Sequence, residues 1–286
     1  MPQKEDALAS LLLSPTDANL ASKSINNTWT RRMTTLVVIK LLRRFRRGPQ
    51  SVLFLGPRIC LKYGATTSLS EASTMQFIAQ KTQISVPKVY CAFKRKNKAY
   101  IVMEKMRGDM LCNVWGNLSE DSQDRILTHL RLLIHDMRQL QPTTTHVSNI
   151  DGGPLWDGRI PGPGFYVGPF DTQEQFHRYL RRDITQPIDG HPEIAQLIEM
   201  HKKEWPLCFT HADLSSFNIL VRDDRVIAII DWATSGWYPA YWEFTTAITM
   251  VNPQNTFWGG YVDKFLERFP QELEMEKIRQ RYFGEI

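Results

Sequence analysis

The first third of the chain contains short apolar runs of the kind that form β-strands. Residues 51–55 and 58–63 are rich in Val, Ile, Leu and Phe, and the turn-forming pair Gly56-Pro57 separates them. Residues 89–93 and 100–103 repeat this pattern on either side of a basic turn. The pattern therefore predicts a small antiparallel sheet in this part of the chain.

Between the two pairs of strands, the apolar residues recur at helical spacing. Met75, Ile78 and Ala79 would form one face of a helix. Ser70 is a suitable N-cap, and Glu71 would lie in the first turn, where the helix dipole favours an acid. We therefore expect one helix that begins at about Ser70.

Beyond residue 110 the pattern becomes mostly helical. Ser119 can cap a long helix that Pro142 stops, and its apolar stripe contains Ile126, Leu127, Leu130, Leu133, Ile134, Met137 and Leu140. The predicted fold class is α+β and bilobal. A small N-terminal lobe with the antiparallel sheet spans 1–104, a hinge spans 105–110, and a larger, mainly helical lobe spans 111–286.

Two segments of the second lobe interrupt its helices. Residues 151–170 hold six glycines and four prolines, which predicts a surface loop that shapes a pocket. Further helices are expected at 172–182 and 192–203. After residue 260 we expect a short amphipathic helical tail with a break at Pro270.

The charge is distributed unevenly along the chain. Residues 18–70 contain ten Lys or Arg and no Asp or Glu, whereas the rest has 25 basic and 30 acidic side chains. A content of 42% apolar and 23% charged residues excludes collagen-like, disordered and disulfide-scaffold classes. Four widely spaced cysteines, and no apolar run near the roughly 18 residues that a spanning helix needs, favour a cytoplasmic protein.

One segment combines the residue types that phosphoryl transfer needs. Residues 211–218, with the sequence HADLSSFN, fit the H-x-D-L-x-x-x-N pattern of a kinase catalytic loop. Twelve residues separate Asn218 from Asp231, which suits a hairpin that turns at Asp223-Asp224. Such a hairpin would bring together a carboxylate for the attacking hydroxyl, at Asp213, and oxygen ligands for Mg²⁺.

These motifs, over residues 51–245, resemble the aminoglycoside phosphotransferase-like branch of the protein-kinase superfamily, particularly its fungal members. The matching pieces are Cys60-Leu61-Lys62-Tyr63-Gly64, Glu71, Val86-Pro87-Lys88-Val89-Tyr90, Tyr100-Ile101-Val102-Met103-Glu104, His211–Val221, Ile230-Asp231-Trp232 and Gly236-Trp237-Tyr238-Pro239-x-Tyr241-Trp242-Glu243. Their order along the chain makes the resemblance specific. It implies a bilobal protein-kinase-like fold, with ATP and Mg²⁺ as cofactors.

The resemblance implies a nucleotide site in the first lobe and the hinge. Lys62 would contact the α- and β-phosphates of ATP, and Glu71 would pair with Lys62. Backbone groups around Glu104 and Met106 would meet the adenine. A solvated strand-end lysine and a first-turn acid that serves only its helix are the structural alternatives for Lys62 and Glu71.

The resemblance also implies roles for three residues of the second lobe. Asp213 would accept or orient the proton of the substrate hydroxyl, while Asn218 and Asp231 would hold Mg²⁺. A turn-forming role is the alternative for Asp213. We expect His211 to pack the loop rather than to take part in the chemistry.

Departures from the protein-kinase pattern favour a small-molecule acceptor over a protein acceptor. Ala212 replaces the Arg that reads a phosphorylated activation loop, and only eleven residues separate Asp231 from Glu243, too few to cradle a peptide. No G-x-G-x-x-G precedes Lys62. Its absence leaves a second hypothesis open, namely a nucleotide-binding or interaction module with little turnover.

The motifs assign no role to the basic segment 31–47. In one interpretation this segment is an amphipathic helix on an anionic membrane surface. In the other it is a partly buried helix or strand with solvated arginines. We favour the second interpretation, because the apolar residues of the segment would nearly surround a helix axis. Nucleic-acid binding is not expected, since no stacking motif supports it.

Overall fold

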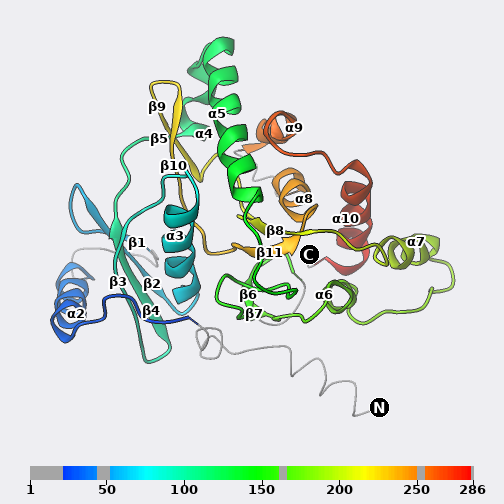
Figure 1. Ribbon diagram of the computed structural model, residues 1–286, viewed down its shortest axis with the longest axis horizontal. Helices are drawn as coiled ribbons and strands as arrows, with labels where there is room; N and C mark the ends of the chain where they lie inside the picture. The colour runs from blue at the N-terminus through cyan, green and yellow to red at the C-terminus, as the bar shows by residue number, and fades with distance from the viewer. Residues whose placement is uncertain (1–21, 44–51, 161–165, 250–254, 285–286) are drawn as a thin grey trace.

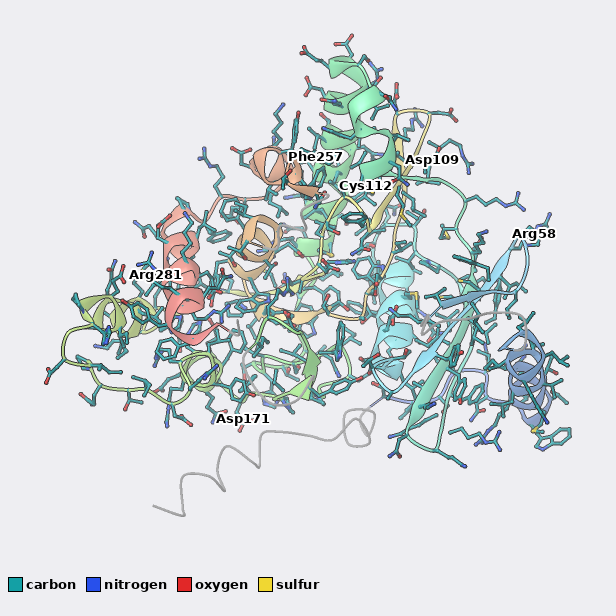
Figure 2. The ribbon with its side chains drawn as sticks, turned by 180° about the vertical axis from the view of Figure 1, so that it is seen from behind. Arg58, Asp109, Cys112, Asp171, Phe257 and Arg281 are labelled. Atoms are coloured by element: carbon teal, nitrogen blue, oxygen red, sulfur yellow. The ribbon has the colours of Figure 1, made fainter. Side chains whose placement is uncertain are left out.

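The computed structural model describes residues 22–43, 52–160, 166–249 and 255–284. The described chain forms an α+β structure with a four-stranded sheet and two helices at one end and a larger, mainly helical part at the other (Figure 1). Arg58, beside the sheet, and Arg281, on the last helix, lie at opposite ends of the molecule (Figure 2). The predicted bilobal fold class is therefore confirmed, while the predicted boundaries of the lobes remain a prediction.

The sheet of the first lobe is antiparallel throughout, and short turns join β1 to β2 and β3 to β4. Its order is β1-β2-β4-β3, with the strands β1 Val52–Phe54, β2 Ile59–Gly64, β3 Val89–Arg95 and β4 Lys98–Glu104. In this register Lys62 of β2 lies opposite Ile101 of β4. The strand β2 thus carries Lys62 in the middle of the sheet rather than at an edge.

Helix α3 (Leu69–Lys81) packs on one face of the sheet (Figure 1). Its N-cap is Ser68, whose hydroxyl accepts a hydrogen bond from the backbone N–H of Ser70. The prediction of Ser70 as the cap was therefore wrong by two residues, because Ser68 and Ser70 both carry a hydroxyl group suited to capping. Glu71 lies in the first turn, as expected.

Helix α2 (Trp29–Arg43) covers the opposite face of the sheet (Figure 1). Ile39 is buried against Leu61 and neighbouring sheet residues, and the guanidinium of Arg32 lies 5.7 Å from the ring centroid of Phe93. The basic segment therefore begins as a helix with one buried face. Residues 44–47 of that segment lie outside the described residues.

The second lobe is built from helices around α5, with further short helical turns. The elements are α4 Leu111–Val114, η2 Trp115–Asn117, α5 Glu120–Arg138, α6 Gln173–Leu180, α7 Pro192–Met200, α8 Trp242–Thr249, η4 Trp258–Gly260, α9 Val262–Phe265 and α10 Pro270–Phe283. Ser119 caps α5 by accepting from the N–H of Ser122, as predicted. Pro270 starts α10 instead of breaking a helix, because proline fits the first turn, where no N–H is needed.

Three small sheets lie among these helices. They are β8 Leu207–Thr210 with β11 Gly236–Pro239; β5 Asp109–Met110 with the hairpin β9 Ile219–Arg222 and β10 Arg225–Ile229; and β6 Leu155–Trp156 with β7 Tyr166–Val167. The hairpin between Asn218 and Asp231 was predicted. The pairing of β8 with β11 was not predicted, and the Gly/Pro-rich loop proves to contain the β6–β7 pair.

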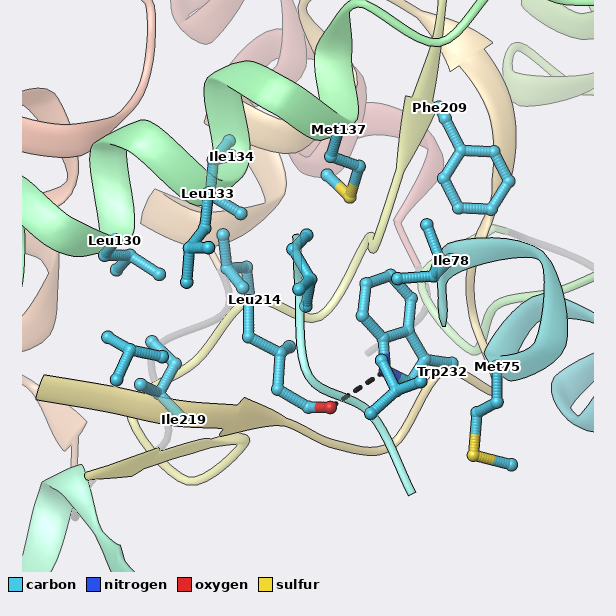
Figure 3. Packing of buried hydrophobic residues seen from close by; sticks show 14 of the residues in the cluster. Met75, Ile78, Leu130, Leu133, Ile134, Met137, Phe209, Leu214, Ile219 and Trp232 are labelled. Carbon is cyan, nitrogen blue, oxygen red and sulfur yellow. Dashed lines mark hydrogen bonds between the residues drawn. The ribbon is translucent and has the colours of Figure 1, made fainter. Parts of the chain in front are cut away.

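One apolar core joins the two lobes. Met75 and Ile78 of α3 belong to the same buried cluster as Leu133 and Met137 of α5, with Trp232 between them (Figure 3). The indole of Trp232 donates to the carbonyl of Ile229, which satisfies its buried N–H (Figure 3). Burial of each such side chain stabilises the folded state by about 1.5–3 kcal/mol, so the contact between the lobes contributes substantially to stability. Among the described residues, no helix is both long and apolar enough to cross a membrane.

Candidate active site

Lys62 contacts one carboxylate from each lobe. Its Nζ lies 2.9 Å from Oε1 of Glu71 on α3 and 2.6 Å from Oδ1 of Asp231, which follows β10. Burial opposes the charge of Lys62, but the two carboxylates outweigh it and raise the pKa of Lys62 above its usual value. A lysine held in this way is permanently cationic and suited to contact phosphate oxygens.

The loop that carries Asp213 begins where β8 ends, at Thr210. His211 is fully buried, its Nε2 lies 3.0 Å from the carbonyl oxygen of Ile230, and its Nδ1 accepts from the N–H of Asp213. Burial lowers the pKa of His211, which favours the neutral ring that this pattern requires. His211 therefore ties the Asp213 loop to the residue before Asp231, in agreement with its expected packing role.

Glu243, at the start of α8, holds the same loop from the other side. Its Oε2 accepts from the N–H of His211 at 2.6 Å, and its Oε1 accepts from the N–H of Ala212 at 3.0 Å. Ala212 has a φ of 64°, a conformation that costs a residue with a Cβ about 1–2 kcal/mol. No role was predicted for Glu243, although it ends the aromatic motif that contributed to the family resemblance.

Asp213 and Asn218 form a pair across the loop that follows β8. Nδ2 of Asn218 donates to Oδ2 of Asp213 at 2.9 Å and to its carbonyl oxygen at 2.8 Å. Burial raises the pKa of Asp213 to about 6, and the positive charge of Arg159 and the hydrogen bond from Asn218 offset only part of this rise. A carboxylate with a raised pKa and a fixed orientation is suited to receive a proton near neutral pH.

Asn218 and Asp231 fit the oxygen ligands that Mg²⁺ prefers. Since Nδ2 of Asn218 is used by Asp213, its Oδ1 remains for a ligand, and the Asp231 side chain is 48% exposed although Lys62 contacts one of its oxygens. Burial disfavours the Asp231 charge, but Lys62 outweighs it and lowers the pKa of Asp231, so the carboxylate stays ionised. The described residues contain no cluster of three or more His, Cys, Asp or Glu side chains that could hold a metal ion by themselves. A nucleotide-bound Mg²⁺ needs only one or two protein ligands, because the phosphates supply others.

The hinge residues take no part in these two networks. The N–H of Glu104 donates to the carbonyl of Lys88, and the N–H of Lys105 donates to the carbonyl of Arg58. Within the described residues, the N–H of Met106 donates to no backbone carbonyl, and its side chain is half-buried. Met106 thus has a backbone donor left for a ligand.

A cavity of about 550 Å³ opens at Asp213. Its wall includes Trp156, Asp157 and Arg159 from the Gly/Pro-rich loop and Arg279 from α10. The expectation that the loop shapes a pocket is therefore confirmed for its described part. Arg159 and Arg279 were not identified from the sequence, because neither belongs to a local motif and only the packing of distant segments brings them to Asp213.

The bilobal α+β architecture is that of the protein-kinase-like superfamily. The model of the phosphotransferase enzyme family matches residues 59–279, which is most of the chain, so the protein belongs to this family. The resemblance inferred from the motifs is thereby confirmed.

Solved structures of aminoglycoside phosphotransferases share the fold. APH(4)-Ia gives a TM-score of 0.56 at 15% sequence identity, over 86% of this chain and 88% of that one. A thermostable mutant of APH(4)-Ia in a ternary complex with ADP and hygromycin B gives 0.56 at 14% identity, over 85% and 88%. At sequence identities this low, the similarity shows a shared fold and no more.

A curated relative comes from the fungus Ampulloclitocybe clavipes. This protein, clavilactone A biosynthesis cluster protein Y, is 25% identical over 209 residues, which cover 60% of this chain and 50% of the relative. The chain thus spans about half the length of the curated relative that it matches.

Proposed function

We propose that the protein is an ATP- and Mg²⁺-dependent phosphotransferase that phosphorylates a hydroxyl group of a small molecule. The observation that carries this proposal is the Asp213 carboxylate, which Asn218 orients in the wall of a cavity. Lys62, between Glu71 and Asp231, provides a fixed cation for the phosphates. Positioning and charge neutralisation supply most of the rate in phosphoryl transfer, and these residues serve both.

The reaction follows from the roles of these side chains. The hydroxyl oxygen of the acceptor attacks the γ-phosphorus of ATP, and its proton passes to the carboxylate of Asp213. The bond between the γ-phosphorus and the oxygen that bridges to the β-phosphate breaks, which leaves ADP and a phosphate monoester. Lys62 holds the α- and β-phosphates, and the N–H of Met106 and the backbone of Glu104 meet the adenine.

Asn218 and Asp231 would hold Mg²⁺, which neutralises charge on the phosphates when it is bound. Asn218 can do so while it orients Asp213, because its amide nitrogen and its amide oxygen serve different partners. Asp231 stays ionised beside Lys62.

A small molecule is favoured over a protein as the acceptor. The segment between Asp231 and Glu243 is short and largely buried, so it offers no platform for a peptide. A cavity of about 550 Å³ lies within the range of small-ligand sites. The mutant of APH(4)-Ia binds ADP and hygromycin B together, a nucleotide with a small molecule.

We also assign the reaction to the cytoplasm, where ATP is available. All four cysteines are free thiols, which suits a reducing compartment.

The proposal is tested with purified protein, Mg-ATP and a panel of hydroxylated small molecules. We expect wild-type protein to consume ATP above background with at least one acceptor. Asp213→Asn should lower this turnover by about 10²- to 10⁴-fold, because it removes the proton acceptor. Asp223→Asn, at the exposed turn of the β9–β10 hairpin, is the matched control and should keep full turnover.

Nucleotide binding is measured separately by the shift of the melting temperature Tm with Mg-ATP. Both aspartate variants should keep this shift, since neither removes a phosphate contact. If wild type and Asp213→Asn are equally silent while nucleotide still raises Tm, the protein is a nucleotide-binding module instead of a kinase.

A further inference from the structure

The cavity at Asp213 has walls rich in hydrogen-bond donors. Arg159 is 9% exposed in its side chain and forms a two-point ion pair with Asp157 through Nε and Nη2. Its third guanidinium nitrogen, Nη1, is buried and has no partner among the described residues. Arg159 and Asp213 line the same cavity.

Arg279 presents a second donor of the same kind. Its side chain is 2% exposed, and Nε donates to Oε2 of Glu276 at 2.7 Å. Nη1 of Arg279 is buried without a partner in the described chain, and so is the indole N–H of Trp156. Oε1 of Glu276 also lacks a partner, but Glu276 is not a wall residue of this cavity.

Three buried N–H donors without acceptors are costly in a folded protein. An unsatisfied buried donor destabilises the folded state, and a charged one does so more strongly. All three belong to residues that line one cavity, and Asp157 and Glu276 are engaged by the two arginines. The complementary group on a ligand is therefore one that only accepts hydrogen bonds, and an anionic acceptor makes the strongest hydrogen bonds to a guanidinium group.

We propose that the acceptor is a hydroxy acid, whose carboxylate binds Nη1 of Arg159, Nη1 of Arg279 and the indole N–H of Trp156 while its hydroxyl faces Asp213. This inference rests on the proposed function, since it names the class of acceptor for that reaction. A cationic group in the same position would be repelled by two guanidinium groups. An uncharged amide would accept fewer and weaker hydrogen bonds.

The test uses a set of aliphatic and aromatic hydroxy acids, each with its matched primary amide and primary amine. Phosphorylation by Mg-ATP gives kcat/KM for each form, and the shift of Tm without nucleotide reports binding. We expect kcat/KM of the acid to exceed that of its amide by about ten- to hundredfold, and the acids alone to raise Tm. Equal or better turnover of amides or amines would overturn the inference and leave the proposed function intact.

Variants separate a carboxylate site from a structural role of the same residues. Trp156→Phe removes one N–H and keeps the ring, so KM for the acids should rise severalfold while kcat and the amides change little. Trp29→Phe, on the exposed face of α2, is its matched control. The double variant Arg279→Gln with Glu276→Gln removes both charges of the buried pair together and should reduce the preference for acids over amides, since Arg159 and Trp156 remain.

The two proposals fail in different ways. If no form is phosphorylated but the acids raise Tm in the wild type and less in Trp156→Phe, the proposed function fails and the carboxylate site stands. If no acid raises Tm and none is phosphorylated, the carboxylate site is wrong.

Discussion

Ala212 and Glu243 show how a single carboxylate can hold a catalytic loop in a costly backbone conformation. Ala212 is buried and has a φ of 64°, where a side chain is disfavoured. Both N–H groups that precede Asp213 donate to Glu243. Glu243 is thus a positioning residue, since it sets where the Asp213 loop starts without facing the cavity itself.

The first prediction concerns Glu243→Gln. The amide keeps one acceptor oxygen but places an NH₂ group against the second backbone N–H, so the free energy of unfolding should fall by about 1–3 kcal/mol. We expect kcat to fall about tenfold or more while KM for ATP stays unchanged, because the nucleotide contacts lie elsewhere. Glu274→Gln, which alters an exposed ion pair with Lys277, should change neither quantity. Wild-type stability and kcat in Glu243→Gln would contradict the positioning role.

The residues that the sequence alone predicted are those that belong to local motifs. Asp213 and Asn218 are five positions apart on one loop, so their pairing follows from the chain itself. Glu243, Arg159 and Arg279 act through contacts with residues far away in the sequence, and no spacing rule identifies them. The family motif contains Glu243, but the motif alone does not say that its carboxylate binds backbone.

At the scale of the elements, two short strand pairs brace the active-site loops. The hairpin β9–β10 separates Asn218 from Asp231 and was predicted from its turn residues. The pair β8–β11 was not predicted, because its strands are only four residues long and the loops with the catalytic chemistry lie between them. The cap of α3 was misplaced for a different reason. Ser68 and Ser70 are both suitable cap residues, and the sequence alone does not choose between them; in the structure their hydroxyl oxygens lie 2.7 Å apart.

A second prediction follows from the close approach of β11 to the loop before β6. A Cβ at Gly236 would lie 2.6 Å from the carbonyl oxygen of Ser148, which bonds the N–H of Trp237. Gly236→Ala should therefore lower the free energy of unfolding by about 1–3 kcal/mol, measured by denaturant titration. Gly116→Ala has open space around its Cβ and should be nearly neutral. Equal effects of the two substitutions would show that the approach is not tight.

At the scale of the whole molecule, the two lobes share one buried core. Ile78 of α3 is completely buried in the same cluster as Leu130 and Ile134 of α5. The ion pair of Lys62 with Asp231 also joins the first lobe to the second. Lobes that are joined in this way should not unfold independently.

The third prediction is a single unfolding transition. Far-ultraviolet circular dichroism and tryptophan fluorescence should give the same Tm for the full chain. Ile78→Ala should cost about 2–5 kcal/mol and lower both values together. Two separate transitions, of which Ile78→Ala moves only one, would contradict a shared core.

We propose that Asp213 directs the γ-phosphoryl group of ATP to a small hydroxylated acceptor. This role is tested by incubating the protein with Mg-ATP labelled in its γ-phosphoryl group and a pool of small metabolites, followed by detection of labelled products by mass spectrometry. We expect at least one small molecule to gain one labelled phosphoryl group with the wild type and not with Asp213→Asn. No labelled product with the wild type, or equal labelling with both proteins, would refute this role of Asp213.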